Sequence, residues 1–461
     1  MPPLVGSSIV LLLFAFFAQI RLSQSVVLFQ LVDSSHFLLF VNWWVAALEN
    51  DAIRPSWKLH VACIGNGSLP RRVGKMHTPG CSQQLGSDPL TLKRIWYTKA
   101  KALLSCIKAT KDDVLLVDLD AILVRDPTST FFSSSSSRFD IISSRDHGPE
   151  RLMHGKHWGL WRLCAGLVLY RYSPHLVDFL ENVLVRVDRL GNDQHQLNLF
   201  LSLTGLVWDE HRDTQHATGA SDAHGAFLWP RPLPRSDLLA PGFAASDRRW
   251  KVSSEAQKQM LHEDLVKWPK GRLIKGAEVE RREMTVRLVR LDVLQRYCHT
   301  FPSATMARYH SVLASASAHA SAAWAGSAPG LRTLDNMVPL DGSNISSSLV
   351  ALHCFYNDGP VQEQGIQKMA LKTRIMRRLK TWLLKPELDH TSAPPKAWAA
   401  SASASDMGVV DVAGPNLALG RHHPANAAFL AEFADKGRVA EMKRVWIERA
   451  GGGRDQRDGK G

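Results

Sequence analysis

The stretch VLLVDLDAILVRDP (114–127) decides both the fold class and the candidate chemistry of this chain. An apolar, β-branched run of this kind is typical of a buried strand, and here it is interrupted by Asp118 and Asp120. Side chains at positions i and i+2 of a strand point to the same side, so a single divalent ion can bridge both carboxylates. Burying both acids without a cation costs free energy or forces one of them to protonate. The stretch therefore predicts a metal site at the end of a strand.

Strands and helices alternate on both sides of this stretch. The pattern predicts strands at 26–32, 57–64, 139–144, 163–171, 284–294 and around 347–353, and helices at 36–48, 91–107 and 174–187. Alternation of this kind favours helices packed on a parallel sheet. We therefore expect an α/β, Rossmann-like fold with a single mixed, mostly parallel sheet flanked by helices. Open sheets of this class bind ligands at the carboxyl ends of their strands, where the two acids are expected.

The composition is that of a globular protein. The 461 residues are 45% hydrophobic and 21% charged, with 56 Lys and Arg against 43 Asp and Glu, which gives a net charge of +13. This excludes a wholly disordered, collagen-like or polytopic membrane protein. The six cysteines show neither CxxC spacing nor pairing with histidines, so no zinc module or dense disulfide scaffold is expected, although isolated bridges remain open.

The amino terminus has the pattern of a membrane signal. Residues 4–20 carry no charge and are followed by Arg21, which fits both a short bilayer span and the core of a signal peptide. We expect residues 1–24 to be a signal anchor or a cleaved signal peptide, and either one directs the chain to the secretory pathway. The sequons at Asn66 and Asn344 are compatible with a lumenal location.

Composition also divides the rest of the chain. We expect one domain at 25–385, with low-complexity insertions at about 211–283 and 303–346, and a partly disordered tail at 386–461 rich in Ala, Ser and Gly. Residues 368–385 predict a basic amphipathic helix. Its cations either form a solvated face or contact anionic lipid or acidic glycan.

Six segments together resemble one protein family. In chain order they are LVDSSHFLLFVNWWVAAL (31–48), VLLVDLDAILVRDP (114–127), FDIISSRD (139–146), CAGLVLYRYSP (164–174), GNDQHQLN (191–198) and ALHCFYNDG (351–359). They resemble segments of nucleotide-diphospho-sugar transferases with the GT-A fold, which include plant and algal arabinosyl-, xylosyl- and galactosyltransferases. The resemblance covers roughly residues 26–210 and 284–375.

The resemblance implies a metal-dependent glycosyltransferase. Such an enzyme moves a sugar from a nucleotide-diphospho-sugar, here expected to be a UDP-sugar, to a glycan or glycoprotein acceptor, and the resemblance implies retention of configuration. It places Asp118 near the ribose and the metal, makes Asp120 and His353 direct ligands of Mn²⁺ or Mg²⁺, and places Lys368 near the donor diphosphate. The leaving diphosphate gains negative charge, which a divalent ion can neutralise. His353 also fits an ordinary core or surface histidine.

The same resemblance assigns roles near the reacting carbon. Asp193 would orient sugar hydroxyls or stabilise an oxocarbenium-like centre, and Gln194 would lie beside the anomeric carbon. The simpler alternative is that Asn192 and Asp193 cap a helix. Gly166 belongs to the segment that lines the sugar pocket in the family.

Other polar residues have open assignments. Lys99 or Lys101 can meet the diphosphate or lie on a solvated helix face. Asp146 can bind a donor hydroxyl or be an ordinary loop acid. Arg145 and Arg171 can pair with Asp146 or serve the structure.

Two alternatives compete with this hypothesis. Asp118–Ala121 also fits a related family of galactosyl- and xylosyltransferases with Asp-x-Asp-Ala, and the sequence does not separate the two. A catalytically silent GT-A scaffold that binds glycan or protein would predict loss of a metal carboxylate or of the Asp-Gln pair, and both are present. One departure from the family is Cys164-Ala165-Gly166, where Asn-x-Gly or Ser-Gly is usual.

The expected partners and location follow from these features. The positive charge is spread through loops and one helix without a nucleic-acid motif, so no nucleic-acid partner is expected. A nucleotide-sugar donor, a glycan or glycoprotein acceptor and a membrane contact through residues 1–24 are expected. The expected location is the Golgi lumen, as a single-pass type II membrane protein or, if the leader is cleaved, as a lumenal or secreted one.

Overall fold

The computed structural model describes the strands and helices of the domain and part of its connections. The described residues are 26–33, 36–64, 72–73, 76–77, 83–85, 92–145, 163–204, 206–208, 222–230, 282–290, 293–297, 349–354, 372–373, 375–377, 379–388, 416–417 and 423–448. The expected leader at 1–24, the insertion at 303–346, Asp146 and Lys368 lie outside them.

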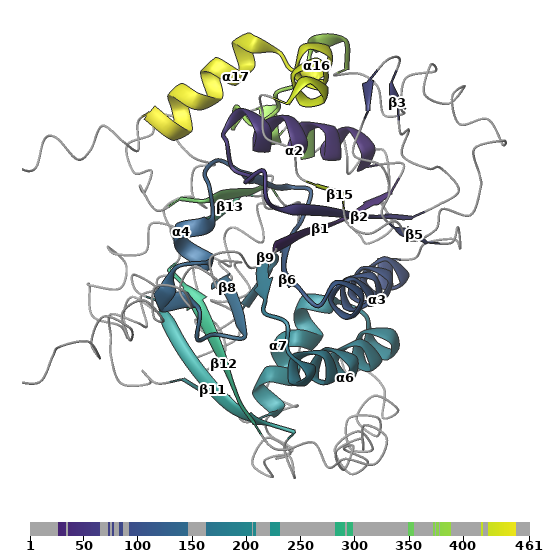
Figure 1. Ribbon diagram of the computed structural model, residues 1–461, viewed down its shortest axis with the longest axis vertical. Helices are drawn as coiled ribbons and strands as arrows, with labels where there is room; N and C mark the ends of the chain where they lie inside the picture. The colour runs from purple at the N-terminus through teal and green to yellow at the C-terminus, as the bar shows by residue number, and fades with distance from the viewer. Residues whose placement is uncertain are drawn as a thin grey trace, which may run out of the picture.

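A ten-stranded mixed sheet forms the centre of the fold (Figure 1). Its strands, in spatial order, are β10 (Val207–Trp208), β11 (Ala223–Trp229), β12 (Arg282–Val289), β8 (Ile141–Arg145), β9 (Leu163–Tyr170), β6 (Asp113–Val117), β1 (Val26–Asp33), β2 (Lys58–Ile64) and β15 (Asn416–Leu417), and β5 (Gln83–Leu85) also pairs with β2. The pairings make every strand run in one direction except β9, β11 and β15. The predicted α/β class with a mixed, mostly parallel sheet is therefore confirmed.

A second, three-stranded sheet lies beside the first. It consists of β13 (Leu294–Tyr297), β14 (Ala351–Cys354) and β7 (Ala121–Leu123). The expectation of a single sheet was therefore wrong, as was that of one buried strand running through Asp118 and Asp120. The strand β6 ends at Val117, and the chain turns through Asp118–Asp120 into β7 of the other sheet, because the Ala121 amide bonds back to the Asp118 carbonyl at 2.9 Å. A third, two-stranded sheet pairs β3 (Arg72–Val73) with β4 (Met76–His77).

Helices cover both faces of the main sheet and enclose two apolar cores. On one face lies α2 (Phe37–Glu49), whose residues are all buried. On the other lie α3 (Leu92–Thr110), α6 (Pro174–Leu190) and α7 (Asp193–Leu203) (Figure 1). Alternate residues of each central strand face opposite cores, as Leu115 and Leu116 of β6 do. The strands are buried on both sides, which explains why they are apolar without alternation.

Local signals place the junction of α6 and α7. Ser173 caps α6 by accepting a hydrogen bond from the Leu176 amide at 3.1 Å, and Pro174 occupies its first position. Gly191 and Asn192 both have positive φ, 70° and 53°. This left-handed pair ends α6 and turns the chain, so that α7 begins at Asp193.

One strand of the main sheet arises inside the expected insertion at 211–283. Residues of β11 alternate between buried and more exposed, with Ala223, Phe227 and Trp229 in the core. They pair with β12, which begins at Arg282 rather than at 284. The expected strand 284–294 also ends early, and its last residue, Leu294, opens β13 in the second sheet.

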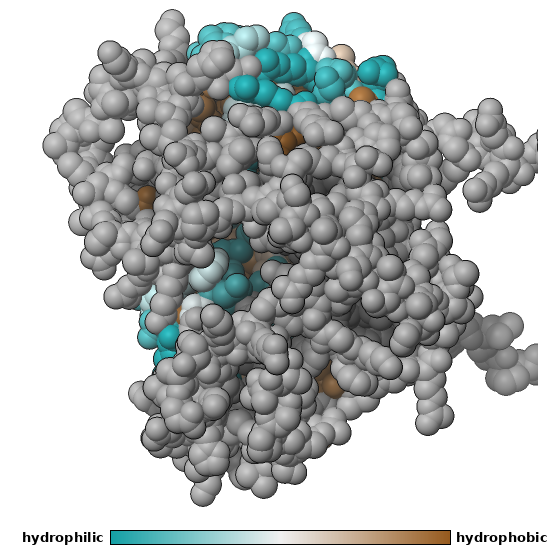
Figure 2. Space-filling model, turned by 180° about the vertical axis from the view of Figure 1, so that it is seen from behind, coloured by the Kyte–Doolittle hydropathy of each residue, from teal (hydrophilic) through white to brown (hydrophobic). Residues whose placement is uncertain are grey.

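The carboxyl-terminal segment 423–448 packs on α2. It forms α16 (Pro424–Phe433), α17 (Lys436–Lys443) and a π-helical turn (Arg444–Glu448), and Phe429, Met442 and Trp446 are buried in the same core as α2. The folded core therefore extends beyond the boundary expected at residue 385. The outward surface of these helices, at the top of the molecule, is mostly hydrophilic (Figure 2).

The helix predicted at 368–385 does not run to residue 385. Helical turns are described only at 372–373 and 375–377, and Lys380 has a positive φ of 59°. The chain beyond it is not helical as far as Lys385, and buried partners bind its backbone. Asn42 of α2 donates to the Thr381 carbonyl at 2.9 Å and accepts from the Leu383 amide at 2.7 Å. On the other side the Leu383 carbonyl accepts from the Asp435 amide at 2.8 Å.

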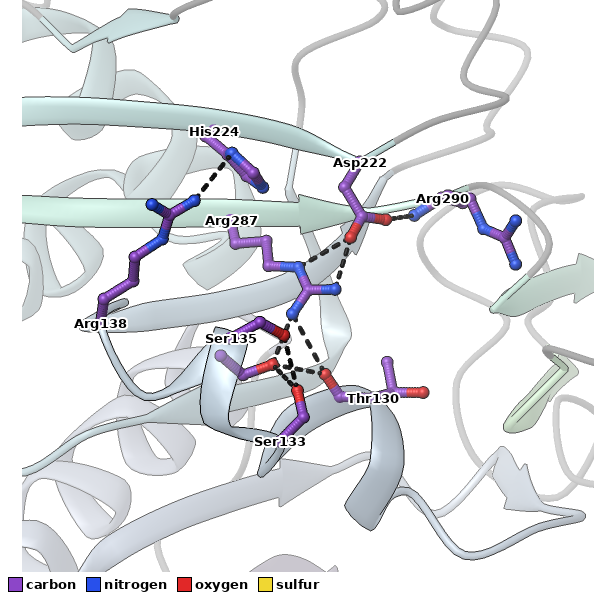
Figure 3. Close-up of polar contacts among 9 residues, drawn as sticks. Thr130, Ser133, Ser135, Arg138, Asp222, His224, Arg287 and Arg290 are labelled. Carbon is purple, nitrogen blue, oxygen red and sulfur yellow. Dashed lines mark hydrogen bonds and ion pairs between the residues drawn. The ribbon is translucent and has the colours of Figure 1, made fainter. Parts of the chain in front are cut away.

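A network around Arg287 fastens a serine-rich loop to the sheet (Figure 3). Arg287 of β12 pairs with Asp222 and also donates to the Ser136 hydroxyl. The Asp222 carboxylate accepts the Arg290 amide at 2.9 Å as well. Ser136 belongs to a 3₁₀ turn (Ser134–Ser136) after α4 (Thr128–Phe131), so this network fixes the loop that follows β7.

Two further findings concern the expected location. Among the helices that the structure describes, none is long and apolar enough to cross a membrane. Cys63 is disulfide-bonded, whereas Cys106, Cys164 and Cys354 are free and buried.

Candidate active site

The candidate site lies at the carboxyl end of β6, beside the amino end of its antiparallel neighbour β9. The Asp118 amide bonds to the Gly166 carbonyl at 2.9 Å and extends the β6–β9 ladder by one pair. Because β9 runs against β6, its first residues lie next to the acids that follow β6. The carboxyl edge of the sheet thus brings 118–120 and 163–166 together.

Two carboxylates and one imidazole converge at this edge. Ligand atoms of Asp118, Asp120 and His353 all lie within 4.8 Å of one another. His353 comes from β14, where it pairs with Ala121 of β7, and the Cys354 amide bonds to the Asp120 carbonyl at 2.7 Å. The small second sheet therefore carries the histidine to the acids. The Nε2 atom of His353 is 3.2 Å from Oδ1 of Asp120.

The reason for this convergence differs from the one expected. Asp118 and Asp120 do not share one face of a strand, because both lie in the turn between β6 and β7. The turn leaves Asp118 partly exposed and Asp120 buried, with side-chain exposures of 29% and 8%. Asp118 and Asp120 therefore lie close together because the chain turns between them, and not because they share one face of a strand.

Asp120 is engaged on both carboxylate oxygens. Lys372 forms an ion pair with Oδ2, and His353 faces Oδ1. Burial opposes ionisation of this carboxyl, but Lys372 and His353 together hold its pKa well below the usual range. Asp120 is therefore an anion at neutral pH although it is buried.

Lys99 of α3 bridges two acids of the site. Its Nζ lies 2.6 Å from Oδ1 of Asp118 and 3.2 Å from Oδ2 of Asp193, the first residue of α7. Burial alone lowers the pKa of this ammonium, but the two carboxylates raise it above its ordinary value. Lys101 points elsewhere: it is exposed and lies over the Tyr97 ring at 5.9 Å. The structure thus brings Lys99, and not Lys101, to the acids.

The first turn of α7 is tied to the start of β9. The side-chain carbonyl of Gln194 accepts the Ala165 amide at 2.9 Å. Asn198, one turn later, accepts the Leu163 amide at 2.7 Å and donates to the Leu163 carbonyl at 2.9 Å. These bonds fix Asp193 and Gln194 beside Asp118 and Lys99.

Gly166 faces the His353 ring. A Cβ built on Gly166 would lie 2.6 Å from Cε1 and 2.7 Å from Nδ1 of that ring, so no larger residue fits without movement. The Cys164 thiol lies 3.8 Å from Nδ1 of His353. The segment expected to line a sugar pocket therefore also holds the histidine.

The donor set suits a hard or borderline divalent ion. Carboxylate oxygens match Mg²⁺ and Mn²⁺, and an imidazole nitrogen is accepted by Mn²⁺ more readily than by Mg²⁺. Asp120 is already deprotonated, which metal binding requires. Asp118, Asp120 and His353 are the residues that would hold the ion.

Several predicted residues are not part of this group. Arg171 lies at the opposite end of β6, where it pairs with Asp113 at 2.7 Å and donates to the Phe131 carbonyl at 3.1 Å, so its role is structural. Asp146, Lys368 and the side chain of Arg145 lie outside the described residues.

Two contacts of the site, made by Lys372 and Cys164, were not predicted from the sequence. Lys372 lies in the basic run 368–385, where the family resemblance indicated Lys368 instead. The structure pairs Lys372 with Asp120. Cys164 stands where the family usually has another residue. Its thiol contacts the His353 ring, which the sequence did not indicate. Neither contact has a local sequence signal, because each joins segments about 190 or more residues apart.

Comparisons with known proteins place glycosyltransferases among the similar structures. No family model and no curated protein matches the chain. Among solved structures it is similar to the glycosyltransferase GlyE of Streptococcus pneumoniae, with 14% identity over 38% of this chain and 43% of that one and a TM-score of 0.25. The galactosyltransferase LgtC, in complex with donor and acceptor sugar analogues, has 17% identity over 38% and 70%, with a TM-score of 0.25. Mouse xyloside xylosyltransferase 1 has 13% identity over 38% and 80%, with a TM-score of 0.24.

The matched part spans less than half of GlyE. The strand order of the sheet defines the fold, and the side chains at its carboxyl edge define the candidate chemistry. The class that these define is an α/β protein whose mixed sheet ends in a cluster of two aspartates and one histidine.

Proposed function

We propose that this chain is a metal-dependent glycosyltransferase of the GT-A type, which transfers a sugar from a UDP-sugar to a glycan or glycoprotein acceptor with retention of configuration. The observation that carries the proposal is the convergence of Asp118, Asp120 and His353 at the carboxyl edge of the sheet. Two segments far apart in the sequence, 114–127 and 351–359, build this group, and each matches a segment of the family resemblance.

The charges of the site support a reaction with an anionic leaving group. The three carboxylates of Asp118, Asp120 and Asp193 form ion pairs with only two lysines, Lys99 and Lys372, so a further cation is needed to neutralise the group. Bound Mn²⁺ or Mg²⁺ supplies a Lewis acid for the leaving nucleoside diphosphate. The ion pairs hold the acids in fixed orientations, which lowers the reorganisation required during the reaction.

The residues of α7 suit the sugar side of the reaction. Oδ2 of Asp193 faces Lys99, while Oδ1 accepts the Gln194 amide at 2.9 Å, so the carboxylate is held in place beside the metal acids. A fixed carboxylate can orient sugar hydroxyls and stabilise positive charge at the anomeric carbon. The Gln194 side chain is positioned by its bond to the Ala165 amide.

A secretory location is part of the proposal. The disulfide of Cys63 fits an oxidising compartment. The apolar segment 4–20 and the two sequons favour the same compartment. We propose the Golgi lumen, with residues 1–24 as anchor or leader.

A donor screen tests the proposal. The full chain is incubated with individual UDP- and GDP-sugars and Mn²⁺, Mg²⁺ or EDTA, and release of nucleoside diphosphate is measured. We expect release from one donor that requires the metal and is lost in Asp120→Asn. Asp112→Asn is the matched control, because Asp112 precedes β6 at its other end and pairs with Lys58 at 3.0 Å.

The same screen distinguishes the competing hypotheses. Metal-dependent release from UDP-galactose or UDP-xylose would favour the related Asp-x-Asp-Ala family. Binding of UDP with the metal but without release from any donor, and without transfer to any acceptor, would indicate a catalytically silent scaffold. Equal activity in EDTA, or full activity of Asp120→Asn, would contradict the metal-dependent reaction.

A further inference from the structure

Asp118 and Asp120 differ in how they are neutralised without a metal. Lys99 has two carboxylate partners, Asp118 and Asp193, and can keep the second if the first turns toward an ion. Lys372 pairs with Asp120 alone among the described residues. The two lysines therefore respond differently when a divalent ion enters the site.

The ion pair with Lys372 occupies a position that a metal needs. Both Asp120 oxygens are engaged, Oδ1 by His353 and Oδ2 by Lys372. The side chains of Lys372 and Asp120 are 12% and 8% exposed, so the pair is largely shielded from water. An ammonium and a divalent cation on the same carboxylate oxygen repel each other strongly in a shielded site, so the two cations compete for it.

We propose that Lys372 is an internal counter-ion of Asp120 that a divalent metal must displace in order to bind. The inference rests on the proposed function, because it concerns the same metal group. In the metal-free protein the lysine is the cation that pairs with the buried carboxylate. On metal binding the ion takes over the neutralisation of Asp120, and the Lys372 side chain leaves Oδ2.

The proposal has a consequence that a merely structural lysine would not produce. Loss of an ordinary structural contact loosens a ligand and weakens metal binding. Loss of a competing cation strengthens metal binding, because the ion no longer has to break an ion pair. The sign of the change in metal affinity therefore distinguishes the two roles.

The experiment measures binding of Mn²⁺ alone to the full chain, by titration calorimetry or from the electron paramagnetic resonance signal of the free ion. We expect Lys372→Met, which is similar in length but uncharged, to bind Mn²⁺ about 10-fold more tightly than wild type. Lys372→Arg retains the charge and forms a fork that can grip the carboxylate with two bonds, so we expect it to bind Mn²⁺ more weakly. The two variants are expected to change the Mn²⁺ affinity in opposite directions, so Lys372→Arg still tests the proposal if Lys372→Met does not fold.

Lys108→Met is the matched control. Lys108 lies on α3 and pairs with Glu181, and its side chain is 45% exposed. The substitution Lys108→Met removes one positive charge, as Lys372→Met does, but outside the acid cluster. We therefore expect its dissociation constant for Mn²⁺ to equal that of wild type. A comparable gain in Lys108→Met would show that net charge alone causes the effect and would overturn the proposal.

The remaining outcomes separate this inference from the proposed function. If wild type binds Mn²⁺, Asp120→Asn does not, and Lys372→Met binds equally or more weakly, then the metal site stands and the counter-ion role is wrong. An affinity of Lys372→Arg equal to or above that of wild type would also overturn the role. If no chain, including Lys372→Met, binds Mn²⁺, both the proposed function and the inference are wrong.

Discussion

Gly166 and His353 are in direct contact across the two sheets, and the contact depends on the absence of a side chain at residue 166. A Cβ there would lie 2.6 Å from Cε1 of the imidazole, which is closer than carbon atoms approach in folded proteins. Gly166 also accepts the Asp118 amide through its carbonyl. One residue of β9 thus fixes the position of a candidate metal ligand and the backbone of another.

We predict that Gly166→Ala weakens Mn²⁺ binding. The added methyl group pushes the His353 ring away from Asp120, and displacement of a ligand typically costs about 10- to 100-fold in metal affinity. The dissociation constant for Mn²⁺ is measured by titration calorimetry on the full chain. Gly437→Ala in α17 is the control, because its Cβ would meet only the Asp435 side chain, at 3.2 Å. Unchanged binding in Gly166→Ala would refute the role of this contact.

A second prediction separates sugar chemistry from metal binding. Asp193 contacts Lys99 and not the histidine of the metal group, so Asp193→Asn should leave the Mn²⁺ affinity within about 3-fold of wild type. The transfer rate at saturating donor and metal should fall about 100-fold, because an oriented negative charge near the reacting carbon is lost. Steady-state kinetics and Mn²⁺ titration test the two parts.

Asp188→Asn is the control for this change. Asp188 is exposed on α6, five residues before Asp193. We expect wild-type rates from it. Equal loss of Mn²⁺ affinity and of rate in Asp193→Asn would instead place Asp193 among the metal ligands.

The carboxyl-terminal segment should contribute strongly to stability. Trp446 is 1% exposed, and its indole donates to the Leu379 carbonyl at 2.6 Å. Trp446→Ala should lower the free energy of unfolding by about 3–5 kcal/mol, because it leaves a large cavity and an unpaired carbonyl. Trp446→Phe keeps much of the packing and should lose less. Urea unfolding followed by circular dichroism measures both, and a loss below about 1 kcal/mol in Trp446→Ala would show that this segment is not part of the core.

Alkaline pH should destabilise the fold through its buried thiols. Burial, with a contribution from the nearby Asp112 charge, raises the pKa of Cys106 from 9.0 to about 12. The thiol of the unfolded chain therefore ionises first, so the unfolded state binds fewer protons between about pH 9 and pH 12 and stability falls as pH rises. One such group contributes about 1.4 kcal/mol per pH unit in that window.

The free energy of unfolding, measured in urea from about pH 8 to about pH 11, tests this sign. Cys106→Ala removes one thiol and should show a shallower decline than wild type. Burial also raises the pKa of Cys164 and Cys354 to about 12, so a decline should remain in the variant. A slope that is identical in both proteins would show that Cys106 does not titrate as the structure indicates.

Local sequence patterns were sufficient for most elements of the fold. The runs around β1, β2, β6 and β9 are apolar because these strands are buried on both faces, and this pattern is visible without any partner strand. The helix predicted at 174–187 is confirmed as α6, and a capping serine and a proline stand at its start. The hydrophobic pattern did not reveal that Asp118 and Asp120 lie in a turn. Two buried strands joined by a short acidic turn have the same pattern as one buried strand that contains two acids.

Non-local contacts explain the elements that were missed. The strand β11 lies in a Pro- and His-rich region and becomes a strand through its pairing with β12. Residues 381–385 are not helical, despite a helical pattern, because Asn42 and the carboxyl-terminal segment bind their backbone. Tertiary hydrogen bonds can outweigh helix propensity, which is worth less than about 1 kcal/mol per residue.

The sequence alone was sufficient to predict the fold class and the acids of the site, since the hydrophobicity and charge of neighbouring residues are local properties of the chain. It predicted Asp118, Asp120 and His353 as one group, but it offered Lys99 and Lys101 as equals and indicated Lys368 as the lysine of the later segment. Only the tertiary structure decided which cations meet which acids. Lys99 and Lys372 reach the carboxylates because α3 and the segment after β14 pack at the same sheet edge, and contacts between segments so far apart depend on the packing of the whole core.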